Sequence, residues 1–276
     1  MATTRMTIEE GHERAKQAGA EPSPEQRPLL GPELLQRSGR VIDLTRPIFE
    51  GMPMWFGHQK TYVMVNQDIP TFKKLWNTNN GFYARSMIIS EHCGTHTDAT
   101  IEYDEQGQSL TETPLEYYWG SAVCLDLSHV KLDPNDPEHT GYAFADDIKV
   151  AEEKLAANGE EIRRGDIVLG WFDYGDRHFP EKVFIDQFPG YSWEAAEYLA
   201  QKGIVNLGTD CAGIDQSHDP EFSAHQVCRK YGLVNTENIG YLGQLASTRF
   251  QFFGLPLNIK DGTGSPIRAF AWVPED

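Results

Sequence analysis

The stretch Ser90–Glu102 (SEHCGTHTDATIE) is where the chemistry of this sequence converges. It follows Ser86–Ile89 (SMII), a short apolar run that predicts a buried strand. In an extended chain, side chains two residues apart share one face of the strand. The side chains that then share a face are His92, His96, Asp98 and Glu102.

Two imidazoles and two carboxylates on one face are costly to bury unless a positive charge lies among them. A divalent metal ion is the simplest such charge, and Gly94 leaves room for an ion to approach the backbone. The alternative is a polar strand face open to water, with solvated histidines. Asp98, two residues after His96 in a chain with only nine histidines, favours the metal site.

Length and charge narrow the classes of function. A chain of 276 residues buries a sizeable core in one domain or in two closely joined lobes. The formal net charge of −17 argues against nucleic acid or an anionic membrane as a partner. No apolar stretch is long enough to span a bilayer, and the amino terminus shows no hydrophobic targeting core.

The four cysteines, Cys93, Cys124, Cys211 and Cys228, form no Cys-x-x-Cys pair. This pattern predicts reduced thiols in a cytoplasmic protein rather than a disulfide framework. Because Cys93 alternates with the histidines along the stretch, we expect it on the opposite strand face, packed in the core.

The chain divides into two parts of different composition. Residues 1–40 are rich in polar residues and proline, which predicts an N-terminal extension that drapes over the body or over a partner subunit. Residues 41–276 are interpreted as one domain, because no low-complexity linker or internal repeat occurs between residues 41 and 274.

Two aromatic segments precede the histidine stretch. Pro47–Gly57 is a turn-rich loop that either packs on the core or lines a pocket, with Trp55 and Phe56 as the pocket candidates. Pro70–Phe82 is predicted to be irregular and is a candidate lid that contains Trp76.

Strands and helices after the histidine stretch mix without strict alternation. This order predicts a mixed α/β (α+β) fold rather than a doubly wound parallel sheet. The sequence contains no glycine-rich nucleotide loop and no Gly-x-Ser-x-Gly elbow, so it shows no sign of a serine hydrolase. The main elements expected are strands at Ala122–Leu127, Ile167–Trp171 and Ile204–Leu207, a helix over Ala145–Ala157, and a helix capped by Ser192 that ends at Gln201.

A second group of polar residues follows the Ile204–Leu207 strand. It comprises Gly208–Asp215 (GTDCAGID), with His225 and Glu237 further along the chain. By itself, a histidine such as His225 is usually structural, and a glutamate such as Glu237 is usually on the surface.

The segment His92-Cys-Gly-Thr-His96-Thr-Asp98 resembles the His-x-Gly-Thr-His-x-Asp signature of the cyclase-type metal-dependent hydrolases. That family includes bacterial kynurenine formamidases and isatin hydrolases. The resemblance runs from about Ile42 to the carboxyl terminus, so it is more specific than one motif. Other matching segments, in order, are Gly51-Met-Pro53, Arg164–Leu169, Phe188-Pro-Gly190, Gly208–Asp210, Ala224-His225 and Gly254–Leu257.

The resemblance implies a fold, a ligand set and an assembly. The fold is a swivelling β/β/α body, and the protein is a homodimer or higher homo-oligomer in which the neighbouring subunit contributes pocket residues. The cofactor is one or two divalent ions, Zn²⁺ or Mn²⁺. The implied ligands are His92, His96, Asp98, His225 and Glu237.

One position departs from the family pattern. The signature continues Asp-x-Pro-x-His, in which the final histidine transfers protons, whereas this chain has Thr100 and Glu102 at those positions. A carboxylate serves as a general base when burial raises its pKa, which makes Glu102 the candidate catalytic residue. The alternatives are that Glu102 coordinates the metal or that the chemistry has changed.

The resulting hypothesis is a metal-dependent hydrolase that cleaves a C–N or C–O bond of a small amide, cyclic imide, lactam or lactone by metal-activated water. Trp55, Phe56 and Trp76 are expected to clasp a cyclic or aromatic substrate. Two other classes stay open: a lyase or isomerase that uses the same ion to stabilise an enolate, and a catalytically silent protein that binds metal or ligand.

Overall fold

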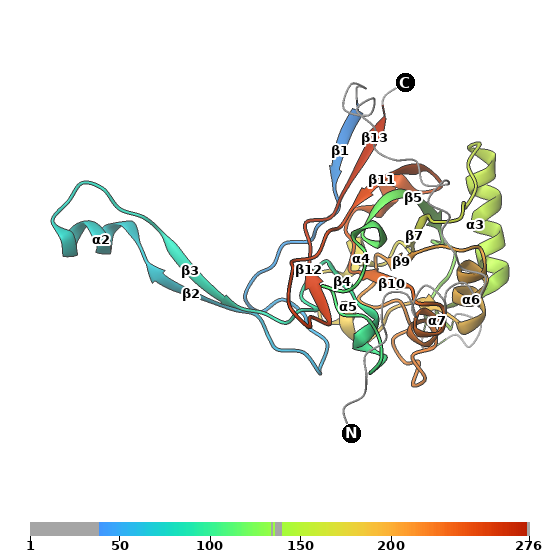
Figure 1. Cartoon of the computed structure of the whole chain (residues 1–276), viewed down its shortest axis with the longest axis horizontal. Helices are drawn as coiled ribbons and strands as arrows, with labels where there is room; N and C mark the ends of the chain where they lie inside the picture. The colour runs from blue at the N-terminus through green and yellow to red at the C-terminus, as the bar shows by residue number, and fades with distance from the viewer. Residues whose placement is uncertain (1–38, 134, 136–139, 275–276) are drawn as a thin grey trace.

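The computed structural model describes residues 39–133, 135 and 140–274, so nearly all of the predicted extension over residues 1–40 lies outside the described residues. A nine-stranded sheet in the order β1-β13-β11-β5-β7-β9-β10-β4-β12 forms the centre of the body (Figure 1). Its strands are β1 Gly39–Asp43, β4 His96–Asp98, β5 Trp119–Asp126, β7 Ile167–Trp171, β9 Asn206–Thr209, β10 Val234–Glu237, β11 Arg249–Phe253, β12 Gly264–Pro266 and β13 Phe270–Pro274.

The sheet is mixed. Strands β5, β7, β9 and β10 form a parallel group at the centre. On one side of it β11, β13 and β1 add in antiparallel pairs, and on the other side β4 and β12 do the same. Parallel strands require crossover connections, which the helices supply, and antiparallel strands need only short loops. The predicted mixed α/β fold is therefore confirmed.

Three helices cover one face of the sheet (Figure 1): α3 Ala145–Ala157, α6 Trp193–Gln201 and α7 Ser223–Tyr231. In α3, Ile148, Ala151 and Leu155 recur at helical spacing and are buried. The Ser192 side chain caps α6 by accepting a hydrogen bond from the backbone N–H of Ala195 at 3.2 Å. Both predicted helices are therefore confirmed with their predicted bounds.

The core forms on both faces of the sheet because neighbouring residues of a buried strand point in opposite directions. In β5, Val123 and Leu125 join the cluster under the helices, while Ala122 and Cys124 join a second cluster on the opposite face. All four cysteines are buried free thiols, and Cys93 packs in the core as predicted. Among the described residues, no helix has both the length and the apolar character needed to cross a membrane.

The strands β2 Tyr62–Gln67 and β3 Ala84–Ile88 form a two-stranded ribbon that projects from the body and carries the helix α2 Ile69–Trp76 at its far end (Figure 1). We call these three elements the arm. Two sequence predictions are wrong here. The run that begins at Ser86 is a strand but is not buried, since Met87 is 55% exposed and Ile88 47% exposed. A two-stranded ribbon has no further layer to cover its apolar residues.

The second error concerns Pro70–Phe82, which begins as the helix α2 rather than as an irregular segment. The Asp68 carboxylate caps that helix by accepting a hydrogen bond from the backbone N–H of Thr71 at 2.8 Å. Pro70 occupies the first turn, where its missing N–H costs nothing. The shorter elements of the fold are η3 Thr100–Glu102, η4 Leu115–Tyr117, β6 Tyr142–Ala143, α4 Gly175–His178, α5 Val183–Asp186, β8 Gly190–Tyr191 and η5 Leu242–Leu245.

Candidate metal centre

The pairing of β4 with β10 brings the two groups of polar residues together. In this antiparallel pair, Glu237 lies opposite His96 and Asn235 lies opposite Asp98. The side chains of His96 and Asp98 share a face because they are two residues apart. The His96 Nε2 atom is 3.5 Å from Asp98 Oδ1 and also 3.5 Å from Glu237 Oε2.

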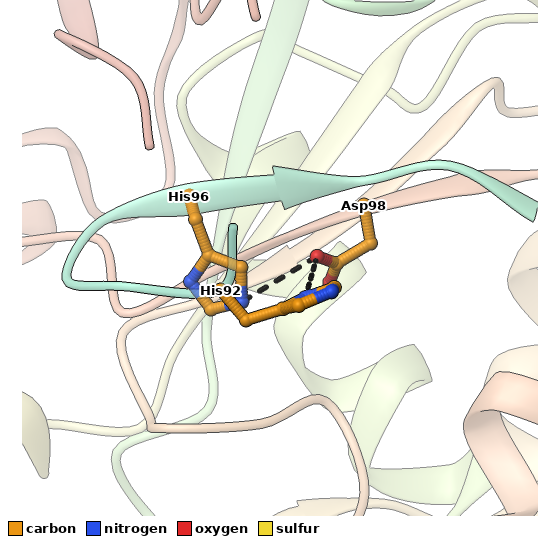
Figure 2. Close-up of side chains that lie close together, drawn as sticks. All are labelled: His92, His96 and Asp98. Atoms are coloured by element: carbon orange, nitrogen blue, oxygen red, sulfur yellow. Dashed lines mark ion pairs between the residues drawn. The ribbon is translucent and has the colours of Figure 1, made fainter. Parts of the chain in front are cut away.

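His92 reaches the same place from a turn rather than from an extended strand. The strand β4 covers only His96–Asp98, so the expected continuous strand is wrong. The chain reverses at Gly94, whose φ of +67° favours glycine, and the His92 side chain folds back onto β4. Figure 2 shows the rings of His92 and His96 directed at Asp98, with His92 Nδ1 2.7 Å from Asp98 Oδ1.

The role expected of Gly94 also needs correction. A Cβ atom there would meet the Ile48 side chain at 3.2 Å, so the missing side chain points toward the Pro47–Gly57 loop rather than toward an ion. The glycine is required for the turn. Its carbonyl oxygen accepts a hydrogen bond from His96 Nδ1 at 2.8 Å and so orients that ring.

Glu102 lies in η3, after the chain has turned away from β4. Its side chain nevertheless faces the cluster, with Oε1 3.3 Å from His92 Nδ1. One turn of 3₁₀ helix therefore returns the carboxylate to the position that an extended strand had been expected to give it.

The helix α7 supplies His225. Asp215 accepts hydrogen bonds from the backbone N–H groups of Ala224 at 2.6 Å and His225 at 3.3 Å, so it anchors the first turn of the helix. The other oxygen of Asp215 bonds His225 Nδ1. The remaining ring nitrogen, His225 Nε2, is 3.4 Å from Glu237 Oε1.

Two overlapping groups of candidate ligands result. The donor atoms of His92, His96 and Asp98 lie within 4.8 Å of one another, and so do those of Asp98, Glu102 and His225. Asp98 belongs to both groups. Glu237 stands beside both through its contacts with His96 and His225.

These residues fit a divalent cation. The outer nitrogen of each histidine has a hydrogen-bond partner: Thr263 for His92, Gly94 for His96 and Asp215 for His225. If each outer nitrogen carries the proton, the inner nitrogens present lone pairs to the carboxylates, and such contacts need a cation between them. Among the described residues, the buried Asp98 Oδ1 has no polar neighbour that could donate a hydrogen bond to it other than the ring nitrogens of His92 and His96. Ligand contacts of 3.4 and 3.5 Å suit atoms that share an ion at bond lengths of about 2.1 Å.

In the absence of an ion, protons balance the charge of the cluster. Burial and the Asp98 charge raise the pKa of Glu102 to about 7 and that of Glu237 to about 8. Burial disfavours protonation of His92, but Asp98 outweighs it and raises the pKa of His92 to about 9. Asp215 similarly outweighs burial and raises the pKa of His225 to about 10. Shifts of this kind are typical of functional sites.

A cavity of about 140 Å³ opens beside the cluster. Its apolar wall includes Trp55, Phe188 and Phe222, and Glu102, His225 and Glu237 line its polar side. The loop Pro47–Gly57 was expected either to pack on the core or to line a pocket, and it does both. Met52 is buried in the core, while Trp55 lines the cavity.

Phe56 and Trp76 do not line this cavity, contrary to prediction. Phe56 is 90% exposed, and Trp76 is 71% exposed on α2, at the far end of the arm (Figure 1). The sequence predicted both residues to lie in segments without regular structure, where the burial of a side chain has no periodic pattern to indicate it. Both side chains lie on the surface of the protein and outside the cavity.

Two further residues at this site, Asn235 and His58, were not predicted from the sequence. Asn235 Nδ2 donates to Asp98 Oδ2 at 2.6 Å and to Glu237 Oε1 at 3.1 Å. His58 lies in the cavity wall with its ring centroid 4.8 Å from that of His92. Asn235 was detectable, because it precedes Glu237 by two residues on a strand. His58 had no local signal.

The motif Gly208–Asp215 contributes two carboxylates with different roles: Asp210 holds a neighbouring loop in place, and Asp215 orients a site residue. Asp210 is buried and accepts hydrogen bonds from the backbone N–H groups of Phe172 at 2.8 Å and Tyr174 at 3.0 Å. It therefore joins the loop after β7 to the end of β9. Asp215, at the other end of the motif, holds His225.

Comparisons with known proteins agree with this architecture. A family model described as putative cyclase matches residues 42–216. The kynurenine formamidase of Bacillus thuringiensis (strain Al Hakam) is 26% identical over 236 residues, which cover 84% of this chain and 97% of the relative.

Solved structures give the same result. An isatin hydrolase bound to the product analogue thioisatinate has a TM-score of 0.72 and 26% identity, covering 89% of this chain and 97% of that one. Isatin hydrolase A from Labrenzia aggregata has the same fold, with a TM-score of 0.70 at 23% identity over 86% of this chain and 94% of its own.

Proposed function

The chain belongs to the putative cyclase family, and from that premise we propose that it is a metal-dependent hydrolase of a small aromatic amide or lactam. The hydrolase class predicted from the sequence agrees with two relatives whose names describe a formamidase and an isatin hydrolase. One observation carries the proposal: two groups of metal-ligating atoms share the buried Asp98, beside a cavity with an aromatic wall.

In this proposal His92, His96 and Asp98 hold a divalent ion, and His225 and Glu237 complete the site. A bound ion supplies Lewis acidity, which activates water and polarises the carbonyl of the substrate. The buried ligands are oriented before the ion arrives, since hydrogen bonds to Thr263, Gly94 and Asp215 fix the three rings.

Glu102 is the group proposed to move protons. Its pKa of about 7, raised by burial and by Asp98, lets the carboxyl accept a proton from water and return one to the leaving nitrogen at neutral pH. Its side chain is 26% exposed and lines the cavity, so it reaches both the ligand cluster and a bound substrate.

The cavity supports a small substrate with a flat ring. Trp55 and Phe188 pack edge to face at 6.3 Å between centroids and give the wall a fixed aromatic corner. Glu102 and His225 line the same cavity, so one bound substrate would contact both the aromatic corner and these polar groups.

We further propose that the ion is Zn²⁺ or Mn²⁺, because imidazole and carboxylate ligands suit both. A homodimer is supported by the arm, whose apolar side chains are exposed in the single chain. Four buried, unpaired thiols support a reducing, cytoplasmic compartment.

The test is hydrolysis by the purified protein after chelation and after reloading with Zn²⁺ or Mn²⁺. The substrates are an N-formyl anilide, isatin and a simple lactone. We expect the reloaded protein to hydrolyse the anilide or isatin and the chelated protein to lose that activity. A metal-loaded protein that cleaves none of the three contradicts the proposal.

A further inference from the structure

His92 differs from the other two histidines in how its ring is held. His96 and His225 lie on regular elements, β4 and α7. The ring of His92 projects from a turn, and its outer nitrogen, Nε2, is 2.9 Å from Thr263 Oγ1. Thr263 comes from the segment that leads into β12, far along the chain.

The Thr263 hydroxyl has a second partner that decides the direction of this bond. Thr263 Oγ1 donates to Glu91 Oε2 at 2.8 Å, and the backbone N–H of Thr263 donates to the same oxygen at 2.8 Å. A threonine hydroxyl has a single proton, and the bond to Glu91 Oε2 uses it. The hydroxyl oxygen then accepts from His92, which places the ring proton on Nε2.

The consequence appears on the other side of the ring. When an ion replaces the second proton of His92, the proton kept on Nε2 leaves Nδ1 free to bind, and this atom lies 2.7 Å from Asp98 Oδ1 and 3.3 Å from Glu102 Oε1. The backbone next to Thr263 also confines the ring, because a Cβ on Gly264 would lie 2.6 Å from His92 Cε1. The His92 ring therefore packs against Gly264 with its Nε2 atom directed at Thr263.

We propose that Thr263 and Glu91 are positioning residues that hold His92 in the tautomer that binds metal through Nδ1. The inference rests on the proposed function, since it concerns a ligand of the proposed ion. It adds a pair of residues outside the His-x-Gly-Thr-His-x-Asp segment. Neither touches the ion or the substrate, and both act through the imidazole of His92.

The test measures affinity for Zn²⁺ by competition with a chromogenic chelator, in the full-length protein. Thr263→Val keeps the shape of the side chain and removes the acceptor, and we expect it to weaken Zn²⁺ binding by about 10- to 100-fold. Thr263→Ser restores the hydroxyl and should restore the affinity. Thr248→Val is the matched control, because Thr248 also loses a hydrogen bond, to the Leu245 carbonyl at 2.7 Å, but lies outside the site.

Glu91→Ala supplies an independent variant. It releases the Thr263 hydroxyl proton, so the hydroxyl can donate to Nε2 and favour the wrong tautomer of His92. We expect weaker Zn²⁺ binding, with an effect that is not additive with that of Thr263→Val. In ¹⁵N spectra of the Zn²⁺-loaded native protein, His92 should show a protonated Nε2.

The outcomes separate the two proposals. Native affinity in both Thr263→Val and Glu91→Ala, or a His92 that carries its proton on Nδ1, overturns the positioning role and leaves the hydrolase proposal intact. A native protein that binds no Zn²⁺ or Mn²⁺ overturns the proposed metal site and this inference with it. A loss in Thr263→Val that Thr263→Ser does not restore counts as general damage to the fold and overturns the inference.

Discussion

Glu237 on β10 lies directly opposite His96 on β4, and their side-chain atoms Oε2 and Nε2 are 3.5 Å apart. The two residues are far apart in the chain, and only the antiparallel pairing of two short strands brings them together. This pairing joins the local His92–Asp98 motif to a distant ligand pair. Because ligands come from both strands, we expect the site to lose its metal when a ligand on either β4 or β10 is replaced.

The first prediction concerns His96. His96→Ala should abolish stoichiometric metal binding and turnover, because it removes a buried ligand atom between Asp98 and Glu237. The measurements are metal content by mass spectrometry and thermal unfolding. His129→Ala is the control, since His129 contacts Asp147 at 3.1 Å on the surface. Full metal content in His96→Ala would exclude the site as described.

The second prediction separates two roles of Glu102. If Glu102 moves protons, Glu102→Gln should keep the metal and lower the turnover rate about 100-fold or more. If Glu102 is instead a ligand, the same change should weaken metal binding, and excess metal should restore part of the rate. Glu116→Gln, an exposed glutamate on η4, is the control. An unchanged rate with unchanged metal content would leave Glu102 without either role.

The third prediction concerns pH. The folded, metal-free protein holds protons on Glu102, Glu237, His92 and His225 at pKa values of about 7, 8, 9 and 10, above the ordinary values of 4.5 and 6.5. The folded state therefore binds more protons than the unfolded state between pH 6.5 and 9, and its stability falls as pH rises.

The measurement is the unfolding temperature of the metal-free protein across that window. It should fall from pH 6.5 to pH 9, and the fall should be smaller with metal bound, because the ion replaces the protons. Metal affinity should rise over the same window. A metal-free protein whose unfolding temperature rises toward pH 9 would contradict the charge arrangement described for the cluster.

The fourth prediction concerns assembly. The arm exposes Leu75 and Trp76 on α2, and a stable protein is expected to cover such a surface. We expect at least a dimer by light scattering at micromolar concentration, and Trp76→Ala should shift it toward the monomer. Trp193→Ala, at a partly exposed tryptophan on α6 of the body, should not.

This experiment also tests whether the arm completes the pocket of a neighbour. If Trp76 acts in the partner subunit, Trp76→Ala should raise KM together with the loss of dimer. A monomeric native protein with full activity would remove any role of a second subunit in the pocket.

The residues that act locally were predictable from the sequence. The helix over Ala145–Ala157 and the Ser192 cap of α6 follow from side-chain spacing and capping within a few residues. His96 and Asp98 share a face because two residues separate them on a strand. The family resemblance, carried by ordered motifs, is confirmed by the matching family model. The metal identity, the assembly and the compartment stay predictions.

The sequence by itself determined which residue types are available for the site and which of them lie on one strand face. The tertiary structure decided the rest. His92 reaches Asp98 only because the chain turns at Gly94, Glu102 only because a 3₁₀ turn reverses it, and His225 only because Asp215 anchors α7. The exposure of Met87 and Trp76 was decided in the same way, since an apolar side chain is buried only where another layer of the fold packs on it. The turns at Gly94 and Glu102 are local, but the position of α7 beside β4 and the packing of apolar side chains depend on segments distant in the chain, which no local spacing encodes.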